Sequence, residues 1–133
     1  MGLLDRLRRR RPEPVVLDPA DPSLELCITA HDAARADSAV LAEAAGRGVD
    51  VTAPLLVRHH LLVPPDAVDE ATAALEADGW AVLPGADGVL LACRTEVITA
   101  LSASRERSRM AGLAQRLGGD VAGWDALRPS VTA

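Results

Sequence analysis

Two adjacent histidines, His59 and His60, are the side chains of this sequence that most readily suggest chemistry, because imidazoles bind metal ions and exchange protons near neutral pH. They lie in the apolar run Leu55 to Val63, which is typical of a buried strand. Consecutive strand residues point to opposite faces of a sheet, so we do not expect this pair to chelate one ion. We expect His59 to be a hydrogen-bonded core residue, with a ligand role as the alternative. His60 shares its face with Arg58, and both are candidates for partner binding.

The other reactive side chains do not have the spacing of a catalytic or metal site. Cys27 and Cys93 lie far apart in apolar surroundings, outside any cluster with zinc-site spacing. We expect two buried free thiols and a reducing cytoplasm. No nucleophile elbow, Walker loop or dinucleotide-binding glycine motif occurs. His31, next to Asp32 at a predicted helix start, is expected to cap that helix or to be exposed. The sequence therefore predicts a protein that is not an enzyme and that needs no metal and no cofactor.

Arginine supplies every basic side chain of this chain, which contains no lysine and has a net charge of -5. Four arginines fall on one predicted helix near the C-terminus: Arg105, Arg107, Arg109 and Arg116. Arg105, Arg109 and Arg116 recur at helical spacing and predict a basic stripe. One interpretation is exposed pairing with acidic residues of a neighbouring helix, namely Asp69, Glu70 and Glu76. The other is docking to an acidic segment of a partner or to phosphates.

The composition limits the partners of this 133-residue chain, which is long enough for one domain. Trp80 and Trp124 are its only aromatic residues apart from histidine, so the core must consist of Ala, Leu and Val. The scarcity of stacking aromatics and the negative charge argue against direct nucleic-acid binding. No stretch reaches the roughly 20 apolar residues of a membrane span.

The periodicity of apolar residues predicts an α+β protein. A strand over 24–30 and a helix within 33–46 precede a run of strand, helix, strand, strand, helix and strand between residues 55 and 124. This βαββαβ order predicts a ferredoxin-like antiparallel sheet with two helices on one face. The strand at 55–63 is apolar on both faces, so we expect the additional N-terminal helix, near 33–46, to cover the second face.

The two ends of the chain are expected to lie outside the domain. Residues 1–22 combine a short leucine face, the run Arg8 to Arg11 and several prolines, which predicts a basic arm and a mobile linker. A solvated arm is one interpretation, and contact with anionic lipid or nucleic acid is the other. A single domain is expected over 23–127, followed by a tail over 128–133. The oligomeric state stays open.

Trp124 is a candidate partner-binding residue, because its small neighbours in "DVAGW" leave the indole little local cover and aromatic anchors dominate many interfaces. Arg58 and His60 could lie at the rim of the same surface. The alternative is that Trp124 fills the core below Gly79 and Trp80.

Several motifs together resemble the regulator of ribonuclease E activity B (RraB) family. They are "HHL" on a strand, an acidic helix that ends in "DGW", a hairpin into "LLACRTEV" and a final helix that leads to "GGDVAGWDAL". The resemblance covers roughly 33–127, and the chain lacks the tyrosine that the family carries before its Gly-Trp. It implies a ferredoxin-like, non-enzymatic regulator that restrains RNA turnover by binding a ribonuclease E-type enzyme. The alternative function is a small-molecule-binding regulatory module.

Overall fold

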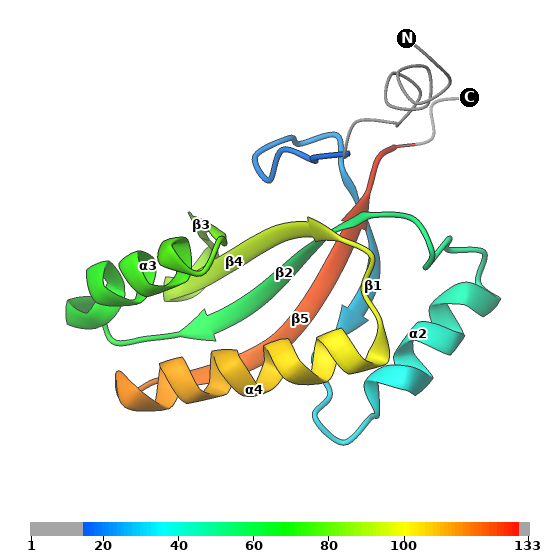
Figure 1. The fold of residues 1–133 in the computed structure, drawn as a ribbon. Coiled ribbons are helices and arrows are strands. Elements are labelled where there is room, and N and C mark those ends of the chain that lie inside the picture. Colours follow the sequence, from blue (N-terminus) through cyan, green and yellow to red (C-terminus); the bar gives the residue numbers. More distant parts are fainter. Residues whose placement is uncertain (1–14, 131–133) are drawn as a thin grey trace, which may run out of the picture.

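The computed structural model describes residues 15–130 as a mixed α+β fold, with a five-stranded antiparallel sheet and three α-helices (Figure 1). The elements are β1 (Glu25–Ala30), α2 (Asp37–Gly46), β2 (Leu55–Leu62), α3 (Val68–Ala77), β3 (Ala81–Pro84), β4 (Val89–Glu96), α4 (Ala100–Arg116) and β5 (Asp120–Arg128). Short 3-10 turns over Pro65–Ala67 and Ala86–Gly88 precede α3 and β4. The predicted succession of strands and helices is confirmed.

Local signals define the ends of the helices that cover the sheet. Thr99 and Ser102 form a capping box at the start of α4, in which each side chain accepts from the backbone N–H of the other residue. Gly79 has φ +90°, in the left-handed region, and lets the chain reverse from α3 into β3.

The strands lie in the order β1-β5-β2-β4-β3, so β2 is central and both of its neighbours are antiparallel to it. β5 pairs with β2 on one side and with β1 on the other, and it is therefore longer than the short strand predicted from "DVAGW". It continues through Arg128, one residue past the expected domain end, and the Ser130 hydroxyl donates to the Ser23 carbonyl.

All three helices lie on one face of the sheet, which we call the helix face (Figure 1). One core cluster there joins residues of α2 (Val40, Leu41, Ala44) to residues of the sheet (Ile28, Val57, Trp124, Ala126). A second joins residues of α3 and α4 (Ala71, Leu75, Met110, Leu113, Ala114) to Leu61, Trp80, Leu90 and Ala92. The expectation that the helix near 33–46 covers the second face is wrong. β1 extends the helix face beyond β5. α2 comes a few residues after β1 in the sequence and packs against this extension.

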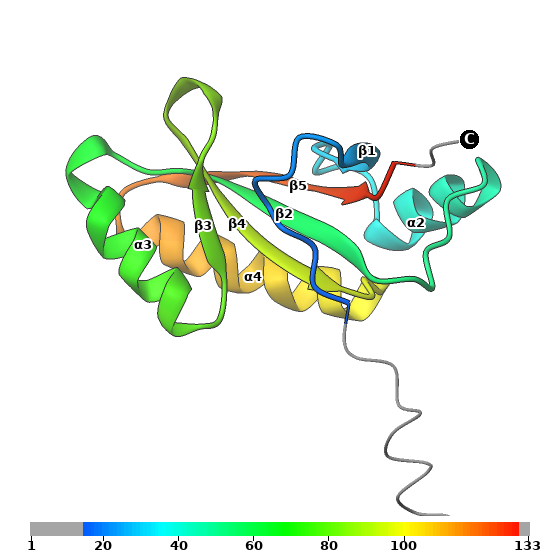
Figure 2. The ribbon, with the colours of Figure 1, turned by 90° about the horizontal axis from the view of Figure 1, so that it is seen from above.

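The second face, which we call the open face, is covered in part by the segment 15–24 that crosses it (Figure 2). Leu17 and Leu24 pack there against Leu56, Leu91 and Cys93, and the Leu17 N–H donates to the Thr95 hydroxyl at 2.9 Å. The part of the expected mobile linker within residues 15–22 is therefore attached to the sheet. The basic run Arg8 to Arg11 lies outside the described residues.

No α-helix within residues 15–130 combines the length and the apolar character that crossing a membrane requires.

Candidate functional site

The adjacent histidines of β2 diverge, as strand geometry predicts, and each has a different partner. The His59 side chain lies on the helix face and is 3% exposed, and its Nε2 is 2.8 Å from a carboxylate oxygen of Glu106 on α4. The His60 side chain lies on the open face, with Nε2 at 2.9 Å from Asp125 of β5. The expectation that His59 is a hydrogen-bonded core residue is confirmed, and the pair does not share a ligand.

His59 belongs to a partly buried cluster between α4 and the sheet, which consists of His59, Trp80, Arg94, Glu96 and Glu106. The Arg94 guanidinium donates to Glu96 at 2.9 Å and to Glu106 at 3.2 Å. It also lies 3.8 Å from the centre of the Trp80 ring, a cation–π contact. The edge of the His59 ring faces the same indole, with the ring centres 5.4 Å apart. One arginine thus holds two carboxylates and an aromatic ring together.

Burial sets the protonation states in this cluster. It lowers the pKa of His59 to about 4, so His59 is neutral near pH 7 and its Nε2–H donates to Glu106. Burial also raises the pKa of Glu96 to about 7, and hydrogen bonding with the neighbouring Glu106 acts in the same direction. The cluster therefore takes up or releases a proton at Glu96 near neutral pH.

Glu106 was not among the residues predicted from the sequence, although a signal was present. It lies on the same helical stripe as Ala103 and Met110, which face the core. A carboxylate on a buried stripe requires partners, because an unpaired buried charge is costly. This pattern predicts a buried acid, but it does not identify Arg94 and His59 as the groups that compensate it.

A groove runs along α4 next to this cluster, and we call it the α4 groove. Its first part is a hollow of about 340 Å³ lined by Trp80, Arg94, Thr99, Leu101, Ser102, Arg105, Glu106 and Arg109. Its second part, of about 210 Å³, is lined by Ala74, Leu75, Asp78, Arg109, Met110, Leu113 and Arg116. Arg109 lines both parts.

The three arginines that the sequence places at helical spacing line this groove. Arg105, Arg109 and Arg116 point within about 40° of one another around the α4 axis, given 100° per residue, and all three are exposed. Arg109 pairs with Asp78 at 3.1 Å. Arg105 and Arg116 form no ion pair within residues 15–130.

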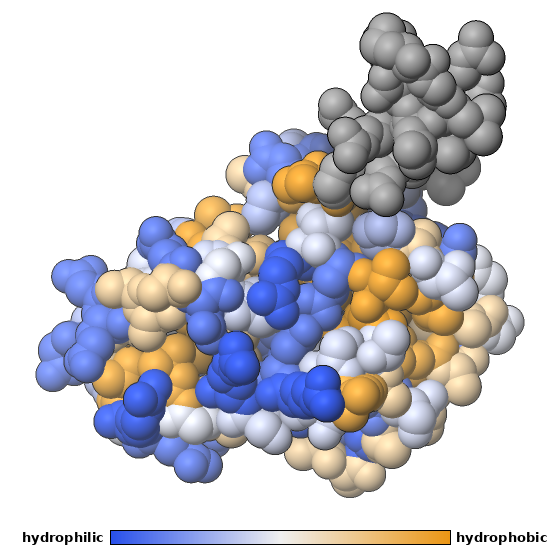
Figure 3. Space-filling model, in the orientation of Figure 1, coloured by the Kyte–Doolittle hydropathy of each residue, from blue (hydrophilic) through white to orange (hydrophobic). Residues whose placement is uncertain are grey.

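The interpretation that these arginines pair with the acidic helix is wrong for the residues named from the sequence, because none of them bonds Asp69, Glu70 or Glu76. Arg107 points to another side of α4, where it pairs with Asp37 of α2. Figure 3 shows strongly hydrophilic groups across the region of α4, with hydrophobic groups on either side.

Trp124 is completely buried on the helix face, so a surface partner cannot reach it. Its indole N–H donates to Asp37 at 3.2 Å, and the ring belongs to the core cluster shared by β1, β2 and α2. The candidate role as a surface anchor is wrong, because α2 and β1 supply cover that its neighbours in sequence lack. The alternative, that Trp124 fills the core, is correct. Its position is not below Trp80, however, because Trp80 belongs to the other core cluster.

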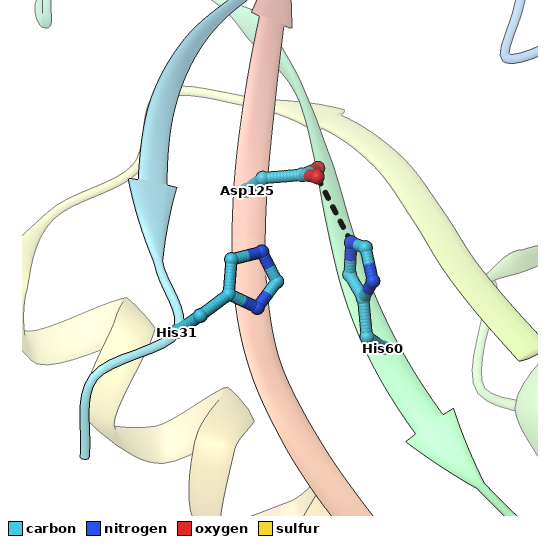
Figure 4. A group of neighbouring side chains, drawn as sticks. All are labelled: His31, His60 and Asp125. Atoms are coloured by element: carbon cyan, nitrogen blue, oxygen red, sulfur yellow. Dashed lines mark hydrogen bonds and ion pairs between the residues drawn. The ribbon is translucent and has the colours of Figure 1, made fainter. Parts of the chain in front are cut away.

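Arg58 and His60 lie on the open face, where both bind Asp125. Figure 4 shows the contact of His60. The Arg58 guanidinium donates to the two carboxylate oxygens of Asp125 at 2.7 and 2.8 Å. His31, just after β1, places its ring against that of His60, with the ring centres 4.7 Å apart. Neither Asp125 nor His31 was predicted to take part, since both are distant from His60 in the sequence.

The two cysteines do not contribute to either site. Both thiols are free. Cys93 is buried, and burial raises its pKa to about 11. Cys27 is only half-buried, and its thiol lies 3.4 Å from the Ala126 carbonyl, to which it donates. Burial raises the pKa of Cys27 as well, so neither cysteine is an activated nucleophile.

Comparison with family models, with curated proteins and with solved structures finds no match to this chain.

Proposed function

We propose that this protein is a non-enzymatic regulator that binds an acidic segment of a partner protein in the α4 groove. The resemblance to RraB suggests a ribonuclease E-type enzyme as the partner and control of RNA turnover in the cytoplasm as the role. The arrangement that we infer for residues 55–128 is ferredoxin-like, extended by β1 and α2. The order β5-β2-β4-β3 and the position of α3 and α4 on one face support this inference.

The observation that carries the proposal is the row of arginines at the groove, of which two have no ion-pair partner in the described part of the chain. Unpaired arginines on one helix stripe of an acidic protein favour a ligand with several negative charges. A rise of 1.5 Å per residue places Arg105 and Arg109 about 6 Å apart along the axis, and Arg109 and Arg116 about 10 Å apart. An extended peptide advances about 3.3 Å per residue, so carboxylates separated by about two residues and then by about three match this row.

The surface between the arginines has room for such a segment. Gly112 lies on the same stripe between Arg109 and Arg116, and a Cβ added there would meet nothing within 4 Å. Glycine weakens a helix interior, and no packing contact requires it here. Leu101, one turn before Arg105, is 60% exposed and adds an apolar contact at the end of the groove. A peptide backbone can approach α4 closely at Gly112 while its acidic side chains reach the arginines.

A second candidate function, the binding of a small molecule, is supported by the hollow at Trp80. Its volume of about 340 Å³ falls at the lower end of the range for ligand pockets, and it combines an aromatic ring, the Arg94 guanidinium and the Glu106 carboxylate. Such a pocket suits a small planar ligand with an anionic group. A thermal-shift screen of metabolites would detect this ligand, because binding to the folded state raises Tm.

The partner proposal is tested by binding to a purified ribonuclease E-type enzyme, measured by biolayer interferometry. The test variant carries Arg105→Ala and Arg116→Ala. The matched control carries Arg35→Ala and Arg47→Ala, which removes the same charge from exposed arginines that pair with Glu43, outside the groove. We expect the groove variant to bind at least tenfold more weakly and the control to bind like the wild type.

Two outcomes contradict the proposal. If wild type does not bind the ribonuclease, the partner is wrong. If both double variants lose affinity equally, net charge and not the groove determines binding. Unfolding does not explain a loss in the groove variant, since substitution of exposed, unpaired side chains usually changes stability by less than about 0.5 kcal/mol.

A further inference from the structure

Three side chains with metal-binding capacity meet on the open face, opposite the α4 groove (Figure 4). His31 follows β1, His60 lies in β2 and Asp125 lies in β5, the strand between these two. One ligand atom from each residue lies within 4.8 Å of the others. The three residues are widely separated in the sequence, so the sheet alone creates this arrangement.

A bulge in β5 brings His31 to this position. The pairing of β2 with β5 shifts between His59 and Leu61, so that Ala122 and Gly123 together lie opposite His60. Gly123 has φ +95°, and a Cβ on it would lie 2.3 Å from the Ala30 carbonyl oxygen and 2.9 Å from the His31 Cα. Only glycine allows this approach, and bulges often redirect side chains at functional sites.

Two of the three side chains, His31 and Asp125, are already held by other groups of the protein in the way that metal ligands usually are. His31 Nδ1 donates to the Ala122 carbonyl, which leaves Nε2 as the free ring nitrogen. Arg58 holds both oxygens of Asp125 at 2.7 and 2.8 Å, and His60 Nε2 lies 2.9 Å from one of them. Hydrogen bonds of this type orient metal-binding histidines and carboxylates in known sites.

The Asp125 carboxylate is buried but paired with a cation. The Arg58 guanidinium donates to both of its oxygens, and this bidentate contact favours the ionised carboxylate. A cation at this place therefore meets an anionic oxygen of Asp125 and two imidazoles. The positive charge of Arg58 is bound to the same carboxylate.

We propose that His31, His60 and Asp125 form a binding site for one divalent transition-metal ion, of which Zn²⁺ is the best match. Two imidazole nitrogens and one carboxylate oxygen are donors that Zn²⁺ accepts, and bonds of about 2.0 Å in a tetrahedral site place donors about 3.3 Å apart. The ion would replace the proton between His60 and Asp125. Because the ligand atoms lie within 4.8 Å of one another without an ion, a movement of at most about 1.5 Å by the exposed His31 side chain brings them to this separation. Arg58 then stays on the carboxylate and orients it.

The site lies outside the α4 groove, and the proposal is independent of the partner proposed above. The expectation that no metal is needed depends on the divergence of His59 and His60 and on two cysteines without partner ligands. That divergence holds, but the pair on the open face is His31 with His60. Three protein donors leave a fourth position for water or for a side chain of another molecule.

The test is isothermal titration of Zn²⁺ into the tag-free full chain, stripped of metal with a chelator, at pH 7.5. We expect one ion per chain with a Kd in the micromolar range or below. His31→Gln should weaken binding at least tenfold, and His60→Gln should do the same. Asp32→Asn, which neutralises an exposed acid beside His31, is the matched control and should bind like the wild type.

A spectroscopic readout reports the geometry of the bound ion, which the titration does not. Co²⁺ added to the wild type should give the intense visible bands of a tetrahedral site with nitrogen and oxygen donors, and these should be absent with His31→Gln, whose side chain is exposed. Binding only at millimolar Zn²⁺ would overturn the proposal. Binding that neither histidine variant weakens would also overturn it, because the ion would then lie elsewhere.

Discussion

Replacing Glu96 with glutamine should change how the stability of this protein depends on pH, because Glu96 titrates differently in the folded and unfolded chains. Burial raises its pKa from the usual 4.5 to about 7 in the folded state. The folded chain therefore binds this proton more tightly than the unfolded chain, and stability falls as pH rises from about 4.5 to 7. Above pH 7 the full cost of a partly buried carboxylate is present. Glu96→Gln removes that cost.

The expected size of the effect follows from the same two values. A difference between 4.5 and about 7 corresponds to at most about 3.4 kcal/mol, at 1.36 kcal/mol for each tenfold change. The Glu96 side chain is 16% exposed and pairs with Arg94, so solvent screening and relaxation reduce the figure to about 1–2 kcal/mol. The gain from Glu96→Gln should thus be about 1–2 kcal/mol larger at pH 8 than at pH 4.5.

His59 contributes the opposite dependence and must be separated from Glu96. Its pKa is lowered from 6.5 to about 4, so its contribution to stability is complete above pH 6.5 and is lost as pH falls towards 4. Between about pH 4.5 and 6.5 the two dependences oppose each other, and the wild type should show a nearly flat profile from this cluster. The Glu96→Gln variant keeps only the pH dependence contributed by His59, so the stability of this variant should rise with pH over the same range.

The assay is urea unfolding followed by Trp80 and Trp124 fluorescence, at intervals between pH 4.5 and 8. Glu43→Gln is the control, because this exposed carboxylate has a lowered pKa through hydrogen bonding to Arg35 and lies outside the cluster. Parallel profiles for wild type and Glu96→Gln across this range would refute the assignment of a raised pKa to Glu96.

Three further predictions concern packing and backbone geometry, and urea unfolding at pH 7 checks each of them. Trp124→Ala should cost about 3–5 kcal/mol, because the indole is completely buried; a cost below 1 kcal/mol would contradict that burial. Gly112→Ala should stabilise α4 by about 0.5–1 kcal/mol, since a Cβ there meets nothing within 4 Å; destabilisation would reveal a contact that the structure lacks. Gly123→Ala should cost at least about 1–3 kcal/mol, because its φ is +95° and its Cβ would overlap the Ala30 carbonyl; a neutral result would show that the bulge is not required.

The periodicity of strands and helices was sufficient to predict the features that depend only on local backbone geometry. The alternation along β2 placed His59 and His60 on opposite faces, and the helical spacing placed Arg105, Arg109 and Arg116 on one side of α4. Both predictions depend only on residues close in the sequence. They are confirmed because the β2–β4 register and the α4 helix are unbroken over these residues.

Features that depend on distant parts of the chain could not be predicted in this way. The apolar stripe of α2 indicates a buried side but not which sheet face it meets. Trp124 looked uncovered because its neighbours are small, whereas its cover comes from β1 and α2, about 80 to 100 positions earlier. The contact of His31 with His60 requires a bulge at Gly123 on a third strand. The spacing of residues along the sequence cannot predict these contacts.

The most direct test of the proposed regulation is the rate at which a ribonuclease E-type enzyme cleaves a fluorescent RNA substrate in the presence of this protein. We predict that the wild type slows cleavage in proportion to the fraction of enzyme bound, that the Arg105→Ala, Arg116→Ala variant does so at least tenfold less effectively, and that the Arg35→Ala, Arg47→Ala control behaves like the wild type. Fluorescence anisotropy of the same RNA without the enzyme should show no binding. A cleavage rate that the wild type leaves unchanged while bound to the enzyme, or inhibition that both double variants retain in full, would contradict the account.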